Sequence, residues 1–171
     1  TTNEGATWAA TSADPFAAGE DVGKGVSFQY GRNTTRVIVP RAETDAGNSA
    51  EIAYSDDGGA SWNNVDVGSV TGQYVTSMFA LNAANVYAGT DDGYIYKSTD
   101  GGATWRKSNS GIDAELRCIF FTSKDVGYCV GEDARIYKTT NQGVEWAQQV
   151  SGFENRYEYD LNLSLIHISE P

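Results

Sequence analysis

A segment of the form Ser/Thr-x-Asp/Asn-x-Gly-x-x-Trp occurs four times in the chain, and this repeat limits the fold more than any other feature. Each tryptophan of the chain closes one copy, and successive tryptophans are 54, 43 and 41 residues apart. A period of about 40–50 residues is that of a four-stranded propeller blade. The positions that define the four copies are Thr1, Asn3, Gly5 and Trp8; Ser55, Asp57, Gly59 and Trp62; Ser98, Asp100, Gly102 and Trp105; and Thr139, Asn141, Gly143 and Trp146.

Each position of this box has a physical role in a tight turn. The Asp or Asn side-chain oxygen can accept hydrogen bonds from backbone N–H groups of its own turn. The glycine supplies the positive φ that such a turn needs, and the hydroxyl at the first position closes the turn from the other side. The tryptophan is expected to bury its ring between neighbouring strands. The four copies therefore predict four turns of one kind.

Similarity outside the box predicts whole blades. Residues 78–79, 85–87 and 95–97 align with residues 119–120, 126–128 and 136–138, each at an offset of 41. A high glycine content with little proline is typical of short strands joined by turns. We predict an all-β fold, a β-propeller fragment of about three four-stranded antiparallel blades plus the last strand of a preceding blade. The blades are expected at about 20–67, 70–108 and 115–150, within a partial propeller of residues 1–162. The expected strands are 25–30, 36–40, 51–55 and 61–67; 75–81, 85–90, 94–98 and 104–107; and 116–121, 126–131, 135–139 and 145–150.

Both ends of the chain are expected to be cut. Residues 1–8 supply only a box and a last strand, and three blades cannot close a ring, since propellers typically have about 4–8. The remaining blades of the parent chain are therefore expected partners. The last nine residues, 163–171, resemble the translation of a transposon mosaic-end adapter used in sequencing libraries. The alternative is an ordinary final strand. In the first interpretation the only histidine, His167, has no functional meaning.

The boxes and strands together resemble the Asp-box, or bacterial neuraminidase repeat, superfamily of β-propellers. That superfamily includes sialidases, some endoglucanases, sortilin-type receptors and photosystem II assembly/stability factors. Residues 116–131 and the box region at 136–146 look most like the last group, which repeats a Gly-aromatic-x-Val-Gly strand before an Ile-x-Lys-Thr-x-Asp-Gly-Gly-x-Thr-Trp box. The likeness covers residues 70–150 well and 20–67 more loosely. It implies boxes at the blade periphery, away from the usual ligand face.

Charge and composition exclude several classes of function. The formal net charge of −11 repels phosphate backbones, so nucleic-acid binding is not expected. No run of 18 apolar residues is present, which argues against membrane insertion by a helix. No Cys/His cluster has metal-ligand spacing, so we expect neither a metal nor a cofactor. An extracellular, cell-surface or virion location is compatible with this chain.

A catalytic set is not apparent. Sialidases carry an Arg-Ile-Pro element before the first box, and the nearest string here, residues 36–40, differs in spacing, so Arg36 is interpreted as an edge-facing residue and Pro40 as the end of a strand. Endoglucanase relatives use two opposed aspartates as general acid and base. Asp91-Asp92 and Glu132-Asp133 are the candidate pairs, but they occupy equivalent loops, which favours a role in turns. We predict no catalytic residue.

Two further pairs of residues are candidate sites. Arg117, on the strand expected to be innermost, and Arg135, on a third strand, could face a ligand and bind a carboxylate or a peptide terminus. The alternative is that both are solvated or locally paired. Cys118 and Cys129 are predicted to lie directly opposite one another across a hairpin, which would allow a disulfide if its geometry is met. The alternative is two buried free thiols.

Repeat regularity without a matched catalytic set favours a non-enzymatic recognition or scaffold propeller. Such a propeller would bind a protein or a glycan through loops on one face. One alternative is a glycoside hydrolase of sialidase-like or endoglucanase-like type whose catalytic residues lie partly outside this chain. Another is a structural component of a phage particle or cell surface.

Overall fold

The computed structural model describes residues 14–16, 23, 25–30, 34–41, 49–71, 73–108 and 110–150. These residues form three four-stranded antiparallel sheets, each with its strands in sequence order. The predicted all-β fold is therefore confirmed. Three predictions lie outside the described residues, namely the box at 1–8, the strand after it and the tail at 163–171.

The strands agree with the predicted ones, but several of their ends are shifted. The first sheet contains β1 (Val26–Tyr30), β2 (Thr34–Pro40), β3 (Ser49–Ser55) and β4 (Asn63–Thr71). The second contains β5 (Val75–Ala80), β6 (Val86–Thr90), β7 (Ile95–Ser98) and β8 (Arg106–Lys107). The third contains β9 (Leu116–Phe121), β10 (Gly127–Gly131), β11 (Ile136–Thr139) and β12 (Ala147–Gln149). The 3₁₀ turn η1 (Glu132–Ala134) joins β10 to β11.

The last strand of the second sheet starts later than predicted because the box turn is longer than expected. Thr104, predicted to begin this strand, binds Asp100 through both its N–H, at 2.9 Å, and its hydroxyl, at 2.6 Å. Those bonds hold Thr104 in the turn, so regular pairing begins only at Arg106. In the third sheet the Glu145 N–H donates to Asn141 Oδ1 at 3.0 Å, which keeps Glu145 in the box turn, so β12 also begins later than predicted.

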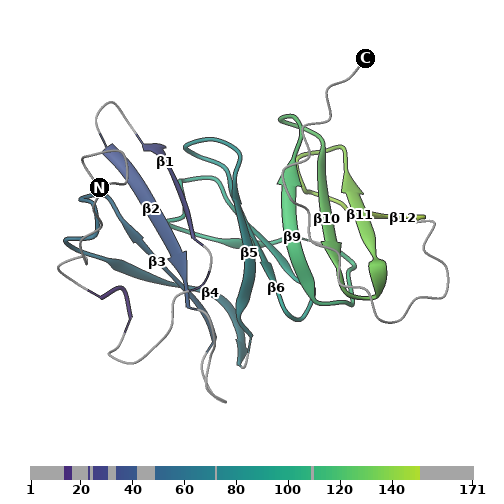
Figure 1. Ribbon diagram of the computed structural model, residues 1–171, viewed down its shortest axis with the longest axis horizontal. Coiled ribbons are helices and arrows are strands. Elements are labelled where there is room, and N and C mark those ends of the chain that lie inside the picture. Colours follow the sequence, from purple (N-terminus) through teal and green to yellow (C-terminus); the bar gives the residue numbers. More distant parts are fainter. Residues whose placement is uncertain are drawn as a thin grey trace, which may run out of the picture.

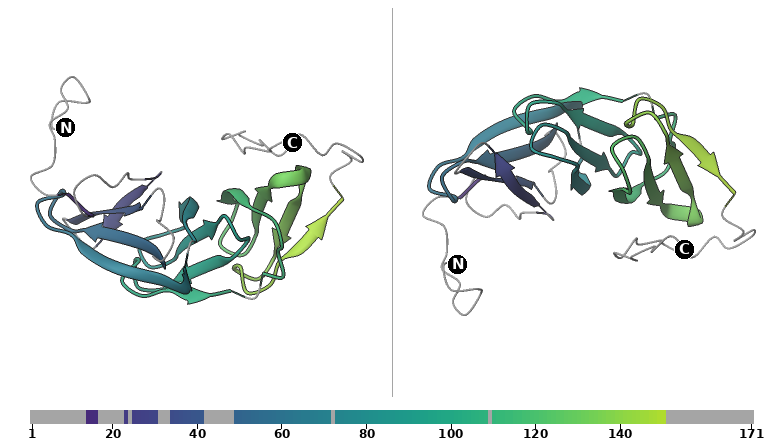
Figure 2. Two further views of the ribbon diagram at one scale, coloured as in Figure 1. Left: turned by 90° about the horizontal axis from the view of Figure 1, so that it is seen from below. Right: turned by 90° about the horizontal axis from the view of Figure 1, so that it is seen from above.

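The three sheets follow one another along an arc, as Figure 2 shows. Their first strands lie side by side, β1 beside β5 and β5 beside β9 (Figure 1). Each sheet has two different ends. The end that carries the box turns at 55–62, 98–105 and 139–146 is called the box end. The opposite end, which carries the β6–β7 turn at 91–94, the connector at 110–115 and η1, is called the loop end.

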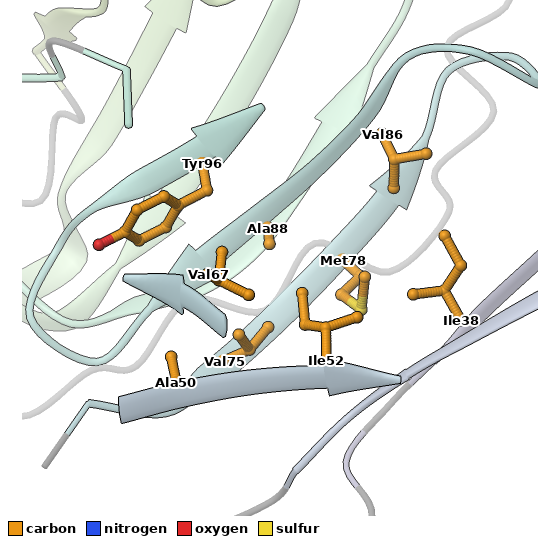
Figure 3. Packing of buried hydrophobic residues seen from close by; sticks show 9 residues of the cluster. All are labelled: Ile38, Ala50, Ile52, Val67, Val75, Met78, Val86, Ala88 and Tyr96. Carbon is orange, nitrogen blue, oxygen red and sulfur yellow. The ribbon is translucent and has the colours of Figure 1, made fainter. Parts of the chain in front are cut away.

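The apolar core lies between the sheets. Figure 3 shows the cluster between the first and second sheets, with Ile38 and Ile52 facing Met78, Val86 and their neighbours. Side chains alternate along a strand, so Tyr87, next to Val86, points to the third sheet instead. There it joins a second cluster of buried residues, which comprises Tyr87, Ile95, Ile112, Leu116, Ile119, Phe121, Cys129, Tyr137 and Trp146. Each sheet is therefore stabilised chiefly by its neighbours.

Candidate functional site

The three described box turns share one hydrogen-bond network. In the first sheet the Ser55 hydroxyl accepts the Gly59 N–H and donates to Asp57 Oδ1, both at 2.8 Å. Asp57 accepts the Ser61 N–H at 2.9 Å and the Ser61 hydroxyl at 2.6 Å. The equivalent residues are Ser98, Asp100, Gly102 and Thr104 in the second sheet, and Thr139, Asn141, Gly143 and Glu145 in the third. The box residues are therefore occupied by bonds within their own turns.

In each of the three described boxes two consecutive residues have positive φ, whereas only the glycine at the fifth position was expected to. At the fifth position φ is 90° for Gly59, 93° for Gly102 and 76° for Gly143. At the fourth position φ is 74° for Gly58, 72° for Gly101 and 61° for Gln142. A non-glycine residue in this conformation is strained by about 1–2 kcal/mol. Gln142 has compensating contacts, since its Nε2 donates to Asp125 Oδ1 at 2.8 Å.

Hydrogen bonds within the turns stabilise the ionised form of the box aspartates. Bonds from the Ser61 hydroxyl and N–H, together with one from Ser55, lower the pKa of Asp57 to about 2. Burial alone would raise the pKa of Asp100, but the bonds from Thr104 and Ser98 outweigh it and the pKa is lowered. Both carboxylates are thus kept charged for structural reasons, which does not suit proton transfer near neutral pH.

Arg36 connects the first sheet to the box turn of the second, so the interpretation of Arg36 as an edge-facing residue is wrong. β2 lies between β1 and β3, and Arg36 is only 5% exposed. Its Nε and Nη2 bind the two carboxylate oxygens of Asp56 at 2.7 and 2.6 Å. Its Nη1 donates to the carbonyl of Gly101 at 3.0 Å. The pattern could not indicate this role, because Asp56 and Gly101 stand at variable box positions.

Tyr87 and Lys97 make the equivalent connection between the second and third sheets. The Tyr87 hydroxyl donates to the carbonyl of Gln142 at 2.9 Å, and Lys97 Nζ donates to the same oxygen at 3.0 Å. Burial raises the pKa of Tyr87 to about 12 and lowers the pKa of Lys97. In both of these connections between neighbouring sheets, the acceptor is the backbone carbonyl of the fourth box residue, Gly101 or Gln142. The box end is therefore where neighbouring sheets are joined.

The loop end gathers charged side chains from three segments. Asp91 accepts the Tyr74 N–H at 3.0 Å, and Asp92 accepts Gln73 Nε2 at 3.0 Å. These contacts join the β6–β7 turn to residues 73 and 74, which lie just before β5. Burial, with a smaller contribution from Asp92, raises the pKa of Asp91. In the second and third sheets, the charged residues described at this end are Asp91, Asp92, Asp113, Glu115, Arg117, Glu132, Asp133 and Arg135, and Lys107 on β8 also reaches it, with its Nζ 3.0 Å from the centroid of the Tyr94 ring.

Arg117 and Arg135 both lie at the loop end, but each has acidic partners of its own. Arg117 Nη1 is 2.6 Å from Glu115 Oε1, a close charge contact outside hydrogen-bond geometry, and its Nη2 is 3.3 Å from Glu132 Oε1. Arg135 pairs with Asp113 and lies 3.8 Å from Asp133 Oδ2. Burial raises the pKa of Glu115, an effect that Arg117 opposes and Glu132 reinforces. Among these described residues six are acidic and three are basic, so the described part of the loop end carries net negative charge.

The described residues hold no group of three or more His, Cys, Asp or Glu side chains placed to bind a metal ion. No helix in the described part of the chain is long and apolar enough to cross a membrane.

The cysteines do not face one another, so the predicted register is wrong by one residue. Cys129 is opposite Ile119, and Cys118 is opposite Val130. Because side chains alternate between the two faces of a sheet, the two thiols point to opposite faces. Neither cysteine forms a disulfide; Cys129 is buried and Cys118 is half-buried. Burial raises the pKa of the Cys129 thiol well above its usual range.

Comparison with known families identifies this architecture. The family described as the DUF6242 beta propeller domain matches residues 6–157. The chain belongs to this family. A search of curated protein sequences finds no match. The three sheets of this DUF6242 propeller chain are therefore propeller blades.

Solved structures with similar folds include two of YCF48. The structure of YCF48 bound to D1 peptide has a TM-score of 0.53 and 16% identity, over 81% of this chain and 44% of that one. YCF48 from Cyanidioschyzon merolae has a TM-score of 0.54 and 18% identity, over 80% and 39%. The GH74 enzyme from Niastella koreensis has a TM-score of 0.51 and 22% identity, over 66% and 20%. The DUF6242 chain thus spans less than half the length of each, and the likeness concerns the fold.

Proposed function

We propose that this chain is part of a non-enzymatic recognition or scaffold propeller that binds a protein partner at the loop end. The observation that carries the proposal is the placement of charge. The loop end presents partly exposed carboxylates held by backbone bonds and ion pairs, whereas the box end is used for joining sheets. Loops on a rigid scaffold are the usual place for recognition. The net negative charge favours a partner segment rich in lysine and arginine.

The comparisons support the protein-binding part of this proposal. YCF48, whose fold is similar, has been solved with a bound D1 peptide, so a propeller of this kind can accept a polypeptide. The repeated bond network supports the finer proposal that the turns are Asp-boxes of the bacterial neuraminidase repeat type. We also propose blade limits at about residues 20–67, 70–108 and 115–150. A glycan partner is the alternative that the experiment below distinguishes.

The test is selection of binders from a displayed library of random peptides, followed by affinity measurement. The loop-end variant Asp92→Asn/Asp133→Asn removes two exposed carboxylates. The matched variant Asp125→Asn/Glu145→Gln removes two exposed carboxylates at the box end. We expect lysine- and arginine-rich peptides whose Kd rises about tenfold in the first variant and less than about twofold in the second. Failure to enrich any peptide, together with binding on a glycan array, would contradict the proposal.

A glycoside hydrolase is the second candidate, and one observation favours it. A general acid needs a raised pKa, and the pKa values of Asp91 and Glu115 are both raised by burial. The GH74 enzyme, which shares the fold, is consistent with this candidate. The test is turnover of sialyl and β-glucan substrates. Turnover that disappears in Asp91→Asn and Glu115→Gln would establish the hydrolase, whereas no turnover by the intact protein would exclude it for those substrates.

A further inference from the structure

One aromatic ring at the loop end carries a positively charged side chain of its own sheet. Lys107 Nζ lies 3.0 Å from the centroid of the Tyr94 ring. Two other described lysines, Lys97 and Lys138, lie 5.4 and 5.6 Å from the centroids of their tyrosine rings. Within the part of the chain that the structure describes, Lys107 Nζ makes no hydrogen bond or ion pair. The Tyr94 ring is therefore what holds the Lys107 ammonium group.

The Tyr94 ring is held in place by its turn and by the core beneath it. The Tyr94 N–H donates to the Thr90 hydroxyl at 3.1 Å, and the Tyr94 carbonyl accepts the Thr90 N–H at 3.0 Å. The half-buried ring packs against the apolar cluster between the first and second sheets. The turn thus presents a fixed aromatic face, and the negative charge density of such a face attracts a cation.

Two carboxylates belong to the same turn as the ring. The exposed Asp92 accepts Gln73 Nε2 at 3.0 Å, and Gln73 is itself buried. Asp91 accepts the Tyr74 N–H at 3.0 Å. These bonds fix the two carboxylates, but neither donor is charged, so the negative charge of the turn is not neutralised by them. The turn therefore combines an aromatic face with carboxylates, and both attract an ammonium group.

The positions of Tyr94 and Lys107 change chemistry from sheet to sheet. The register of the last two strands identifies the equivalent residues as Glu51 and Asn64 in the first sheet and Arg135 and Gln148 in the third. The hydrogen bond that closes the box turn is, in contrast, the same in all three sheets. The ring and the lysine are therefore no part of the common framework of the blades. Variable positions on a constant framework suit the recognition surface of a repeat protein.

We propose that Tyr94 and Asp92 form a subsite for a lysine side chain of the partner, and that Lys107 occupies this subsite in the free protein. The partner's ammonium group lies on the Tyr94 ring and pairs with Asp92, while Lys107 moves into solvent. A lysine is the expected guest because the group already seated on the ring is a primary ammonium. The inference rests on the proposed binding of a basic polypeptide at the loop end and identifies the residues that bind one of its side chains.

Lys107 can leave the ring at little cost. The residue is exposed and lies on the two-residue strand β8. A contact between a cation and a ring is weak at an exposed site, and a released lysine regains rotamer freedom. Lys107 is thus an internal competitor that should raise the Kd of the partner about two- to fivefold.

The first test measures the Kd of acetyl-hexalysine amide for the intact chain at roughly 0.05 M salt. Lys107→Gln should lower this Kd about two- to fivefold more than Arg106→Gln does. Arg106 is the matched control, since it is the exposed neighbour of Lys107 on β8 and its side chain points to the opposite face. Both variants remove one positive charge, but only the first empties the ring. Equal effects of the two variants would mean that charge alone is responsible, and would overturn the proposal.

The second test separates the ring of Tyr94 from its hydroxyl. Tyr94→Leu should raise the hexalysine Kd at least about threefold, whereas Tyr94→Phe keeps the ring and should retain binding within about twofold. Thermal unfolding shows whether both variants are folded at the temperature of the measurement. Equal binding by folded Leu and Phe variants would refute the role of the ring. If the Leu variant does not fold, the comparison of Lys107→Gln with Arg106→Gln decides.

The third test follows Lys107 itself by NMR. In the free protein its ε-methylene protons should be shifted upfield by the ring current of Tyr94, and Lys107→Gln assigns the signal. Saturation with hexalysine should return the signal to the position of a solvated lysine. A signal that is not shifted in the free protein, or that stays shifted while hexalysine is bound, overturns the subsite but leaves the function proposed for the loop end standing. If hexalysine does not bind, the subsite is refuted, and the peptide selection described above decides the proposed function separately.

Discussion

Tyr87 of the second sheet donates its hydroxyl to the backbone carbonyl of Gln142 in the third sheet, across 2.9 Å. Its ring meanwhile stacks on Phe121 at a centroid distance of 4.3 Å. Burial raises the pKa of Tyr87 to about 12, so the hydroxyl stays protonated and remains a donor throughout the physiological range. One side chain thus supplies both apolar packing and a polar contact between blades.

Substitution Tyr87→Phe should lower the free energy of unfolding by about 1 kcal/mol. The ring and its packing are kept, and Lys97 still donates to the Gln142 carbonyl, so only one hydrogen bond is lost. Urea denaturation measures the effect. The control is Tyr94→Phe, because the Tyr94 hydroxyl makes no hydrogen bond to the described residues, and it should change stability by less than about 0.5 kcal/mol. Equal losses of unfolding free energy in the two variants would argue that the Tyr87–Gln142 hydrogen bond does not stabilise the packing of the two sheets.

Gly102, at the fifth position of the box in the second sheet, should tolerate a side chain far less well than Gly58, at the fourth position of the box in the first sheet. Gly102→Ala places a Cβ 2.6 Å from Ile38 Cδ1, whereas a Cβ on Gly58 meets nothing within 4 Å. Both positions have positive φ, so both variants carry about 1–2 kcal/mol of backbone strain. Overpacking should add about 1–3 kcal/mol to Gly102→Ala alone. Thermal unfolding of the two variants tests this difference.

Acid should weaken the box of the first sheet within a defined pH range. The folded-state pKa of Asp57 is about 2, below its usual 3.8. A lowered pKa adds stability that is complete above the unfolded value, and this stability is lost as pH falls from about 4 towards 2. Asp57→Asn should therefore flatten the dependence of melting temperature on pH in that range. The third sheet provides the comparison, since Asn141 does not titrate, and Asn141→Gln should leave the pH dependence unchanged. A steep acid transition that persists in Asp57→Asn would mean that other groups dominate.

The two thiols should remain free and should differ in reactivity. Cys129 is buried and its raised pKa disfavours the thiolate, whereas Cys118 is half-buried. Reaction with iodoacetamide at pH 8, followed by peptide mass spectrometry, should label Cys118 well before Cys129. In urea the two rates should become similar. An intact mass that rises by two hydrogens on reduction would reveal a disulfide and contradict the register found here.

Much of the fold could be predicted because the box repeats and its chemistry is local. Ser98, Asp100 and Gly102 lie within one turn, so their bonds follow from residue type and spacing alone. The hydrogen bonds between neighbouring sheets could not be predicted from residue type and local spacing. Arg36 and Gly101 are 65 residues apart, and no local pattern marks a contact that depends on how two sheets pack.

The error over the cysteines has a different cause. The prediction paired Phe120 with Gly127, whereas the hairpin pairs Phe121 with Gly127. A shift of one residue reverses the face on which every side chain lies, and the sequence of a five- or six-residue loop does not determine which register forms. Arg117 and Arg135 both lie at the loop end, but their pairing with Glu115 and Asp113 depends on the path of the 110–115 connector.

Two-dimensional ¹H–¹⁵N NMR of a bound peptide shows whether the loop end is the recognition surface. A lysine- and arginine-rich peptide selected as described above would be titrated into the ¹⁵N-labelled chain. We expect chemical-shift changes at residues 91–94, 112–115 and 132–135, with the box turns at 55–59 and 98–102 unaffected. Changes confined to the box turns, with none at the loop end, would contradict it.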